Sequence, residues 1–199
     1  MRDEGYIKYT AKHITASAVE MPQWAELNEA RNNLYKLGLV GVYPNGIGFG
    51  NVSARFSGEE FLISGTETGV KPVLSPSDYC IVKSFDITHN HVVSSGPIQA
   101  SSESMTHGAV YRSCPAANCV IHIHSKTIFD NMIRDCYPAT PIAAAFGTPD
   151  IAVAIGNIVS DKGEGQIVMA GHEEGIITYG ATIQRALSLI LELYNKYGG

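Results

Sequence analysis

The sequence predicts an α/β fold in which helices cover both faces of a central, largely antiparallel β-sheet. The first reason is a series of short apolar segments joined by turns that contain Gly, Ser or Asn, which is typical of β-hairpins. The second is a set of longer segments whose apolar residues recur with period 3.6, as in amphipathic helices. Because these helices alternate with the strands, they are expected to pack on both faces of the sheet.

The N-terminal half is expected to contain one helix followed by short strands. The helix is predicted over Glu20–Leu39, where an apolar stripe ends close to Gly38. A glycine-rich bend over Gly46–Asn51 then leads into the strands. These are predicted over Val52–Phe56, Glu60–Ser64, Tyr79–Phe85 and His91–Val93.

The C-terminal half is expected to alternate between helices and strands. A helix is predicted over Glu103–Arg112, with Ser101 or Ser102 as its N-cap, and an apolar strand that ends at His124 follows it. Further helices are predicted over Lys126–Ile133, Pro149–Val159 and Thr182–Tyr194, and further strands over Pro141–Phe146 and Gly165–Ala170.

The length of 199 residues and the 45% hydrophobic content predict one globular domain over residues 1–199. Residues 1–20 match no pattern and are expected to be either an N-terminal arm that packs on a neighbouring subunit or a flexible segment. Only 17% of the residues are charged and the net charge is −5, which argues against nucleic acid or an anionic membrane as a partner. The sequence has neither the pattern of a signal peptide nor a run of about 18 apolar residues, so a cytoplasmic location is expected.

The four cysteines are expected to be reduced, because they form neither a CxxC pair nor a dense framework. We interpret them as buried small apolar residues, and disulfide partners or thiolate ligands are the alternative. They are Cys80, Cys114, Cys119 and Cys136.

Two histidines one residue apart, His122 and His124, are the strongest chemical signal. A strand alternates its side chains with period 2, so both imidazoles project from one face while Ile121 and Ile123 enter the core. Neutral imidazole is the commonest nitrogen ligand of Zn²⁺ in proteins. The pair therefore predicts half of a metal site.

His172 is the preferred third ligand, because it follows a buried strand that stops at Gly171. Glu103 is a candidate fourth ligand or proton acceptor, although a capping role in the first turn of its helix is the structural alternative. His107 lies one helical turn further and is expected to fill a core position.

His89 and His91 form a second HxH pair, but they flank Asn90 in a polar turn, where ligands are poorly preorganised. We therefore set this pair aside.

Two segments with small residues, Gly48–Asn51 and Ala100–Ser102, are weak candidates for anion binding through backbone N–H groups. The nucleotide motifs GxxxxGKS and GxGxxG are not matched.

Five motifs occur in order between residues 23 and 194. They are Gly50–Phe56, Phe61–Thr66, Ala100–Glu103 with His107 and Tyr111, Val120–His124, and Gly171–Gly175. Each motif alone would be weak, but their shared order is specific. Together they resemble the class II aldolase/adducin family.

The resemblance implies an αβα sandwich, assembled as a homo-oligomer and most often as a homotetramer, with a divalent metal, usually zinc, in each site. It assigns the metal to the three histidines and gives the glutamate of the Ser-Ser-Glu motif a double role as fourth ligand and acid/base. It further implies that neutral polar residues bind a substrate phosphate. In this sequence the ligands are His122, His124, His172 and Glu103, and the phosphate-binding residues are Asn51, Thr66, Ser101 and Ser102.

The implied function is that of a zinc-dependent lyase, which cleaves a small sugar or sugar phosphate by retro-aldol chemistry through a metal-stabilised enediolate. Epimerisation, decarboxylation and dehydration can use the same scaffold, so these reactions stay open. The alternative to an enzyme is a non-catalytic adducin-like binding or assembly module. Such modules lack the complete set of metal-ligating residues, which this chain has.

Two departures from the family pattern bear on the substrate and the reaction. The sugar-phosphate aldolases read Thr-Gly where this chain has Thr66-Glu67, and a carboxylate there would repel a phosphate. Either Glu67 points away or the substrate is not phosphorylated. A proton-donating tyrosine is not evident at its expected place, and Tyr137 and Tyr197 are the candidate substitutes.

Overall fold

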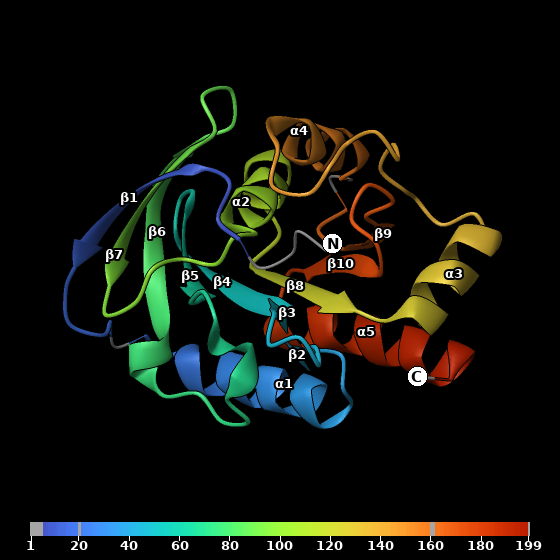
Figure 1. Cartoon of the computed structure of the whole chain (residues 1–199), viewed down its shortest axis with the longest axis horizontal. Helices are drawn as coiled ribbons and strands as arrows, with labels where there is room; N and C mark the ends of the chain where they lie inside the picture. Colours follow the sequence, from blue (N-terminus) through green and yellow to red (C-terminus); the bar gives the residue numbers. More distant parts are fainter. Residues whose placement is uncertain (1–5, 20, 160–161, 199) are drawn as a thin grey trace.

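An eight-stranded sheet forms the centre of the part of the chain that the computed structural model describes, residues 6–19, 21–159 and 162–198 (Figure 1). The strand order is β1-β7-β6-β5-β4-β8-β10-β9, and only the β1–β7 pair is parallel. The strands are β1 (Thr10–Thr15), β4 (Asn51–Ser57), β5 (Glu60–Ser64), β6 (Tyr79–Asp86), β7 (His91–Gly96), β8 (Cys119–His124), β9 (Gly165–Val168) and β10 (Gly175–Gly180).

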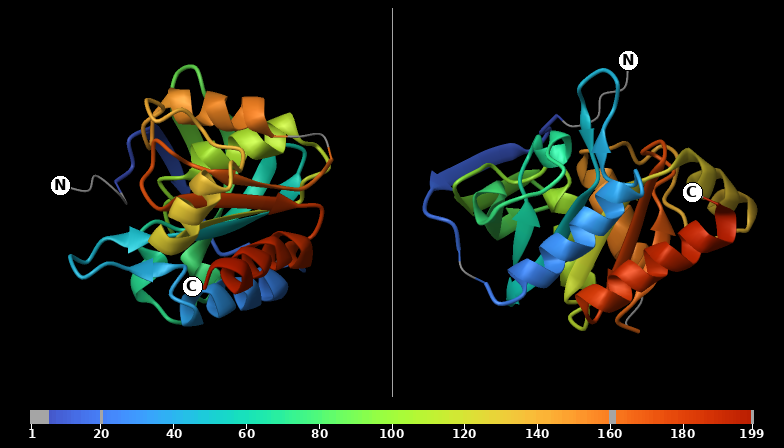
Figure 2. Two further views of the ribbon diagram at one scale, coloured as in Figure 1. Left: turned by 90° about the vertical axis from the view of Figure 1, so that its right-hand side faces the viewer. Right: turned by 90° about the horizontal axis from the view of Figure 1, so that it is seen from below.

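Helices lie on both faces of this sheet (Figure 2). On one face, Leu27 of α1 and Ile190 of α5 share an apolar cluster with Ile121 of β8. On the other face, Val110 of α2 packs in a second cluster with Val120. The helices are α1 (Trp24–Lys36), α2 (Ser104–Ser113), α3 (Lys126–Arg134), α4 (Pro149–Ile158) and α5 (Ile183–Tyr197), with 3₁₀ turns η1 (Thr68–Val70) and η2 (Pro76–Asp78). The predicted αβα sandwich is confirmed.

A small hairpin stands apart from the main sheet. It consists of β2 (Gly41–Val42) and β3 (Gly48–Phe49), and it projects beyond the body of the molecule in both views of Figure 2. The connecting turn closes with a hydrogen bond from the Gly46 N–H to the Tyr43 carbonyl at 2.8 Å. The predicted bend began only at Gly46, because the Asn45-Gly46 hairpin signal was not used.

The predicted helices and hairpins are found with small changes at their ends. The first helix begins at Trp24 rather than Glu20, and Glu20 itself lies outside the described residues. Ser101 and Ser102 are not the N-cap of α2, because Glu103 occupies that position and its N–H donates to Oγ of Ser101 at 3.3 Å.

The strand predicted over Pro141–Phe146 is wrong. The segment turns instead, with the Ala144 N–H donating to the Pro141 carbonyl at 3.0 Å. It packs so closely on Gly171 that a β-carbon there would lie 1.8 Å from the Ala144 oxygen. Apolar content alone could not distinguish this turn, of which only Ala144 and Phe146 are buried, from a strand.

Strands β1 and β10 were not predicted. Residues 10–15 of the expected N-terminal arm form β1, which extends the sheet beside β7, whereas residues 1–5 and 20 lie outside the described part. β10 pairs with both β8 and β9, so the motif that contains His172 is a turn between two strands.

All four cysteines are free thiols, as expected. The prediction that they are buried holds for Cys80, Cys114 and Cys119, but it is wrong for Cys136, which is exposed. Cys136 follows α3 in a left-handed backbone conformation with φ 57°, so its side chain leaves the helix end. Burial raises the pKa of the Cys80 thiol to about 12, which makes it unreactive.

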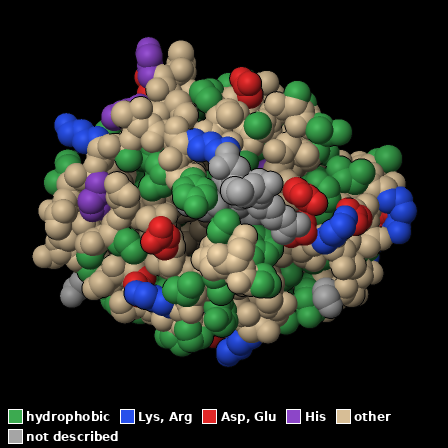
Figure 3. Space-filling view, in the orientation of Figure 1, with side chains coloured by type: hydrophobic (Ala, Val, Ile, Leu, Met, Phe, Trp, Pro, Cys, Tyr) green, Lys and Arg blue, Asp and Glu red, His purple; other side chains and the backbone are tan. Residues whose placement is uncertain are grey.

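No helix within the described ranges has the length and apolar character needed to cross a bilayer. Figure 3 shows the surface in the orientation of Figure 1, with Lys and Arg side chains spread apart and acidic side chains between them. On the described part of this face, the charges therefore form no broad area of one sign.

Candidate active site and metal centre

Strand β8 places His122 and His124 on the same face of the sheet. Ile121 and Ile123 enter the cluster beneath α1 and α5, as predicted, so the two imidazoles lie on the side of α2 and α4. Both histidines are buried, with 1% and 3% exposure, and their ring centroids are 4.7 Å apart. The pairing of β8 with β4 also places Asn51 directly opposite His122.

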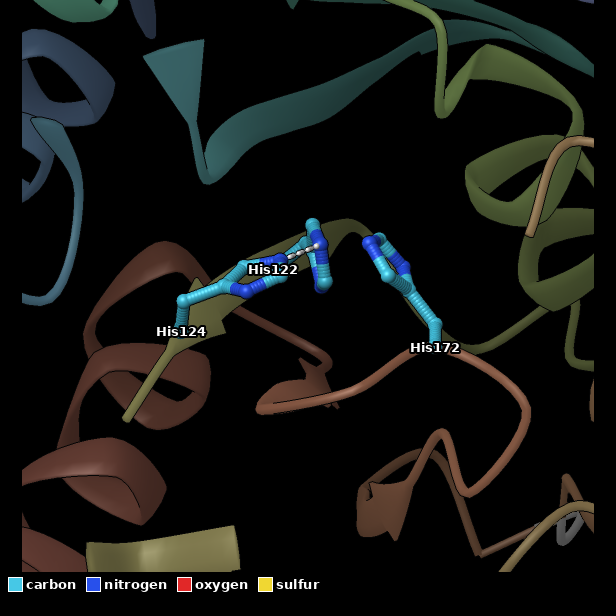
Figure 4. A group of neighbouring side chains, drawn as sticks. All are labelled: His122, His124 and His172. Atoms are coloured by element: carbon cyan, nitrogen blue, oxygen red, sulfur yellow. Dashed lines mark hydrogen bonds between the residues drawn. The ribbon is translucent and has the colours of Figure 1, made fainter. Parts of the chain in front are cut away.

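His172 reaches the same point from the turn between β9 and β10 (Figure 4). Its N–H donates to the Met169 carbonyl at 2.8 Å, and its carbonyl accepts from the Gly175 N–H at 2.9 Å. The Phe146 ring packs on the imidazole with a centroid distance of 4.5 Å. The two backbone hydrogen bonds therefore fix the turn, and the Phe146 ring covers the imidazole of His172.

The three histidines form a group in which one ring nitrogen from each lies within 4.8 Å of the others. Among the described residues, this is the group of His, Cys, Asp and Glu side chains with the spacing of a metal site. It is the triad that the sequence analysis favoured.

The hydrogen bond at Nδ1 of His122 indicates which ring nitrogen carries the proton. Nδ1 lies 3.2 Å from the Ile176 carbonyl oxygen, and a carbonyl only accepts, so the proton of the neutral ring is on Nδ1. Burial, followed by the neighbouring His124 and His172, holds the pKa of His122 well below its usual range. The ring is therefore neutral at pH 7, with a lone pair on Nε2.

His124 reaches the same state through Tyr43. The Tyr43 hydroxyl donates to Oε2 of Glu174 at 2.9 Å, so its oxygen accepts from the Nδ1–H of His124 at 3.0 Å. When this ring is neutral, its Nε2 carries a lone pair and lies 3.0 Å from Nε2 of His122. Two lone pairs at this distance repel each other unless a cation lies between them.

The donor set fits a divalent metal ion. A tetrahedral zinc ion with Zn–N bonds of about 2.0–2.1 Å holds its nitrogen ligands about 3.3 Å apart, close to the observed Nε2–Nε2 separation. Metal-bound histidines also typically donate their second N–H to a carbonyl or carboxylate. Ile176 accepts directly from His122, and Glu174 acts on His124 through Tyr43.

Glu103 lies beside this triad at the N-terminus of α2. Its Oε1 is 3.4 Å from Nδ1 of His172, and the side chain is buried, with 2% exposure of the residue. The turn before α2 is held by Tyr9, whose hydroxyl lies 3.0 Å from the Ser101 carbonyl and 3.1 Å from the Ala100 carbonyl. The N-terminal segment therefore supports the carboxylate that the sequence analysis proposed as acid/base.

The predicted site residues line one cavity, except for His124. The cavity is open to the surface and holds about 30 Å³, which is enough for an ion and a water molecule. A groove of about 420 Å³ adjoins it, and Gly48 and Glu67 line both spaces. The predicted residues that line the cavity are Asn51, Thr66, Ser101, Ser102, Glu103, His122 and His172.

Two residues of the site, Tyr43 and Glu174, were missed by the sequence analysis. Glu174 belongs to the quoted Gly171–Gly175 motif, but no role was assigned to it. Tyr43 reaches the site only because the β2–β3 hairpin folds over His124, with Phe49 between them at 4.4 Å from the Tyr43 ring. The hairpin signal at Asn45-Gly46 would have placed Tyr43 in a hairpin opposite Ile47, but not over His124.

The other histidines lie outside the triad. His107 is fully buried, and its Nδ1 lies 2.7 Å from Oγ of Ser53, which also contacts the Tyr111 hydroxyl at 2.7 Å. The expected core role of His107 therefore agrees with its packing. His89 is exposed and pairs with Asp86 at 2.8 Å.

Neither substitute tyrosine lines the cavity. Tyr197 donates to the Asp135 carboxylate at 2.8 Å, and its ring contacts that of Tyr137. Both therefore belong to a separate cluster at the end of α5, within the described part of the chain.

The comparisons with known proteins agree with this arrangement. Residues 25–195 match the family described as Class II Aldolase and Adducin N-terminal domain. The chain belongs to the class II aldolase and adducin family. The family match includes β8, α2 and the turn with His172, whereas β1 lies outside it.

Two solved structures illustrate the likeness. The L-fuculose-1-phosphate aldolase from Thermus thermophilus is 21% identical, with a TM-score of 0.61 over 86% of this chain and 89% of that one. YgbL from Klebsiella pneumoniae, provisionally described as an aldolase, epimerase or decarboxylase, is 18% identical, with a TM-score of 0.64 over 87% and 85%. At these identities the likeness establishes the class II aldolase fold. A comparison with curated proteins gives no significant match.

Proposed function

We propose that this chain is a divalent-metal-dependent lyase that cleaves a small sugar or sugar phosphate by retro-aldol chemistry, with zinc as the expected metal. The observation that carries the proposal is the 3.0 Å contact between two Nε2 atoms whose protons are both on Nδ1. Family membership supports lyase chemistry, and the names of the similar structures include both aldolase and epimerase activities.

In the proposal, His122, His124 and His172 hold the metal and Glu103 acts beside it. A divalent ion bound there would supply a Lewis acid for the carbonyl and adjacent hydroxyl oxygens of the substrate. In cleavage, Glu103 would accept the proton of the β-hydroxyl as the C–C bond breaks and return it to the carbon next to the carbonyl, because its buried carboxylate faces the same cavity as the triad. Asn51, with a buried Oδ1 that accepts no hydrogen bond from the described residues, is available to orient a substrate hydroxyl.

The metal is tested by elemental analysis of protein purified without chelators. We expect one equivalent of divalent metal in the wild type, and loss of the metal in His124→Ala. His89→Ala is the matched control, because His89 is an exposed histidine outside the triad, and it should retain the metal. A wild-type protein without divalent metal would contradict the proposal.

The chemistry is tested by Glu103→Gln, which keeps the size of the side chain and removes its basicity. The variant should lower turnover by about 10²-fold or more. Its metal content should decrease less than that of His124→Ala. A non-catalytic adducin-like module predicts instead that neither protein turns over any ketose.

Identification of products from a panel of ketoses separates the reactions that share the scaffold. An aldehyde product indicates aldol cleavage and a stereoisomer indicates epimerisation. Release of CO₂ from keto acids added to the panel indicates decarboxylation. Of these, aldol cleavage is the outcome that the proposal requires.

A further inference from the structure

Glu67 lies at the junction between the cavity beside the triad and the adjoining groove. It lines both spaces, so a ligand that reaches from the histidine triad into the groove must pass this residue. Glu67 is exposed, and it forms no ion pair with another described residue. Its carboxylate is therefore available to a ligand.

The backbone at Glu67 is unusual for a residue with a β-carbon. Its φ of 58° and ψ of 18° place it in the left-handed region, where glycine is favoured. Strained positions of this kind are often found where a side chain has a function. The strain is thus consistent with a role for the Glu67 carboxylate in the site.

Close packing on both sides restricts the turn that carries Glu67. A β-carbon on Gly69 would lie 2.1 Å from the Gly41 carbonyl oxygen, and one on Gly65 would lie 2.5 Å from the Ile98 side chain. The buried Arg31 also donates to the Thr68 carbonyl at 3.1 Å. The backbone cannot swing the carboxylate away from the junction without breaking these contacts.

The charges around the cavity disfavour a second anion. Its described lining includes two carboxylates, Glu67 and Glu103, and neither Lys nor Arg. The N-terminus of α2 would ordinarily attract a phosphate, but Glu103 occupies its N-cap with a negative charge. The other polar side chains, from Asn51, Thr66, Ser101 and Ser102, can donate hydrogen bonds to a hydroxyl group or to a phosphate, so the added carboxylate of Glu67 is what disfavours the phosphate.

We infer that the substrate is not phosphorylated at the end that faces Glu67, and that this end is a neutral polyhydroxy group which Glu67 selects by accepting hydrogen bonds. The inference rests on the proposed function, since that proposal makes this cavity the substrate site. It narrows the substrate class from a sugar or sugar phosphate to a free sugar or another small polyhydroxy carbonyl compound.

The test compares dihydroxyacetone with dihydroxyacetone phosphate, which differ only in the phosphate. Binding of each to the zinc-loaded protein is measured by calorimetry for the wild type, Glu67→Gln and Glu67→Gly. The wild type should bind the phosphate no more tightly than the neutral ketone. Both variants should tighten phosphate binding at least tenfold and leave the neutral ketone within about threefold, because one like charge is removed.

Glu29→Gln is the matched control, because Glu29 is an exposed glutamate on α1 outside the cavity. It should leave both affinities unchanged. A wild type that prefers the phosphate, or a Glu67→Gln variant with unchanged phosphate affinity, would overturn the inference. Comparison of Glu67→Gly with Glu67→Gln separates the effect of the charge from that of backbone strain, because only Glu67→Gly also relieves the strain of the left-handed conformation.

A separate measurement distinguishes this inference from the proposed function. Exchange of the carbon-bound protons of dihydroxyacetone in D₂O reports proton removal by the enzyme, whichever ketone binds better. If exchange is absent while the binding preference is as expected, the lyase proposal fails and the charge selection stands. If exchange occurs but phosphate is preferred, the inference fails and the lyase proposal stands.

Discussion

The hydroxyl of Tyr43 lies 3.0 Å from Nδ1 of His124 and links this ring to the Glu174 carboxylate. The link matters because it determines which nitrogen of His124 carries the proton. With Nδ1–H bound to Tyr43, the Nε2 lone pair faces His122 and the cavity side of the sheet. A residue from a projecting hairpin thus orients a buried histidine.

Tyr43→Phe is expected to weaken zinc binding by about 10- to 100-fold, because His124 loses the acceptor that orients its ring. Competition with a chromogenic chelator measures the affinity. Tyr35→Phe, a half-buried tyrosine on α1, serves as the control and should bind zinc like the wild type. Equal affinities of Tyr43→Phe and wild type would show that the link to Glu174 does not orient the ligand.

Tyr9→Phe should lower the free energy of unfolding by about 1–2 kcal/mol, because the buried hydroxyl contacts the carbonyls of Ala100 and Ser101. Urea denaturation measures this change. Tyr6→Phe is the matched comparison, since Tyr6 is 63% exposed, and it should have little effect. If both variants are as stable as the wild type, the N-terminal segment does not hold the turn before Glu103.

Gly171→Ala should destabilise the protein by about 3 kcal/mol and weaken metal binding, because the new β-carbon would lie 1.8 Å from the Ala144 oxygen. The turn that carries His172 must then move. Gly156→Ala in helix α4 provides the contrast. A β-carbon added there would meet only Oγ of Ser113 in α2, at 3.0 Å. Thermal denaturation and metal content of both variants check this, and a stable, metal-replete Gly171→Ala would contradict the packing argument.

The stability of the metal-free protein should decrease in acid because of His107. Burial lowers the pKa of His107 to about 3, whereas the unfolded residue titrates near 6.5. Between these values the unfolded chain binds a proton that the folded chain does not, so the free energy of unfolding falls as the pH drops. His107 alone contributes a loss of about 2 kcal/mol from pH 7 to pH 5.

His107→Gln isolates this contribution from that of the other buried histidines. The variant should be less stable at pH 7, because it disturbs the contact with Ser53, but its stability should fall about 2 kcal/mol less over the same pH interval. Urea denaturation at a series of pH values, with chelator present, gives both curves. Parallel curves for variant and wild type would disprove the prediction.

Much of the fold could be predicted from local patterns. The alternation at Ile121–His124 was enough to direct isoleucines into one cluster and histidines to the other face, because strand geometry has a period of two. The helices carried clear apolar stripes. The turn over Pro141–Phe146 was mistaken for a strand, because its composition is apolar throughout although only Ala144 and Phe146 are buried and Ile142 is 82% exposed.

Residues close together in the chain were enough to specify the pair of histidines on β8, the Ser-Ser-Glu start of α2 and the glycine-bounded turn with His172. Tertiary packing was needed to bring Tyr43, Glu174 and Phe146 to the triad and to place Glu67 where the cavity meets the groove. These positions depend on how a hairpin, a turn and a loop pack against one sheet. Contacts of this kind arise from close packing between distant segments, which no local pattern encodes.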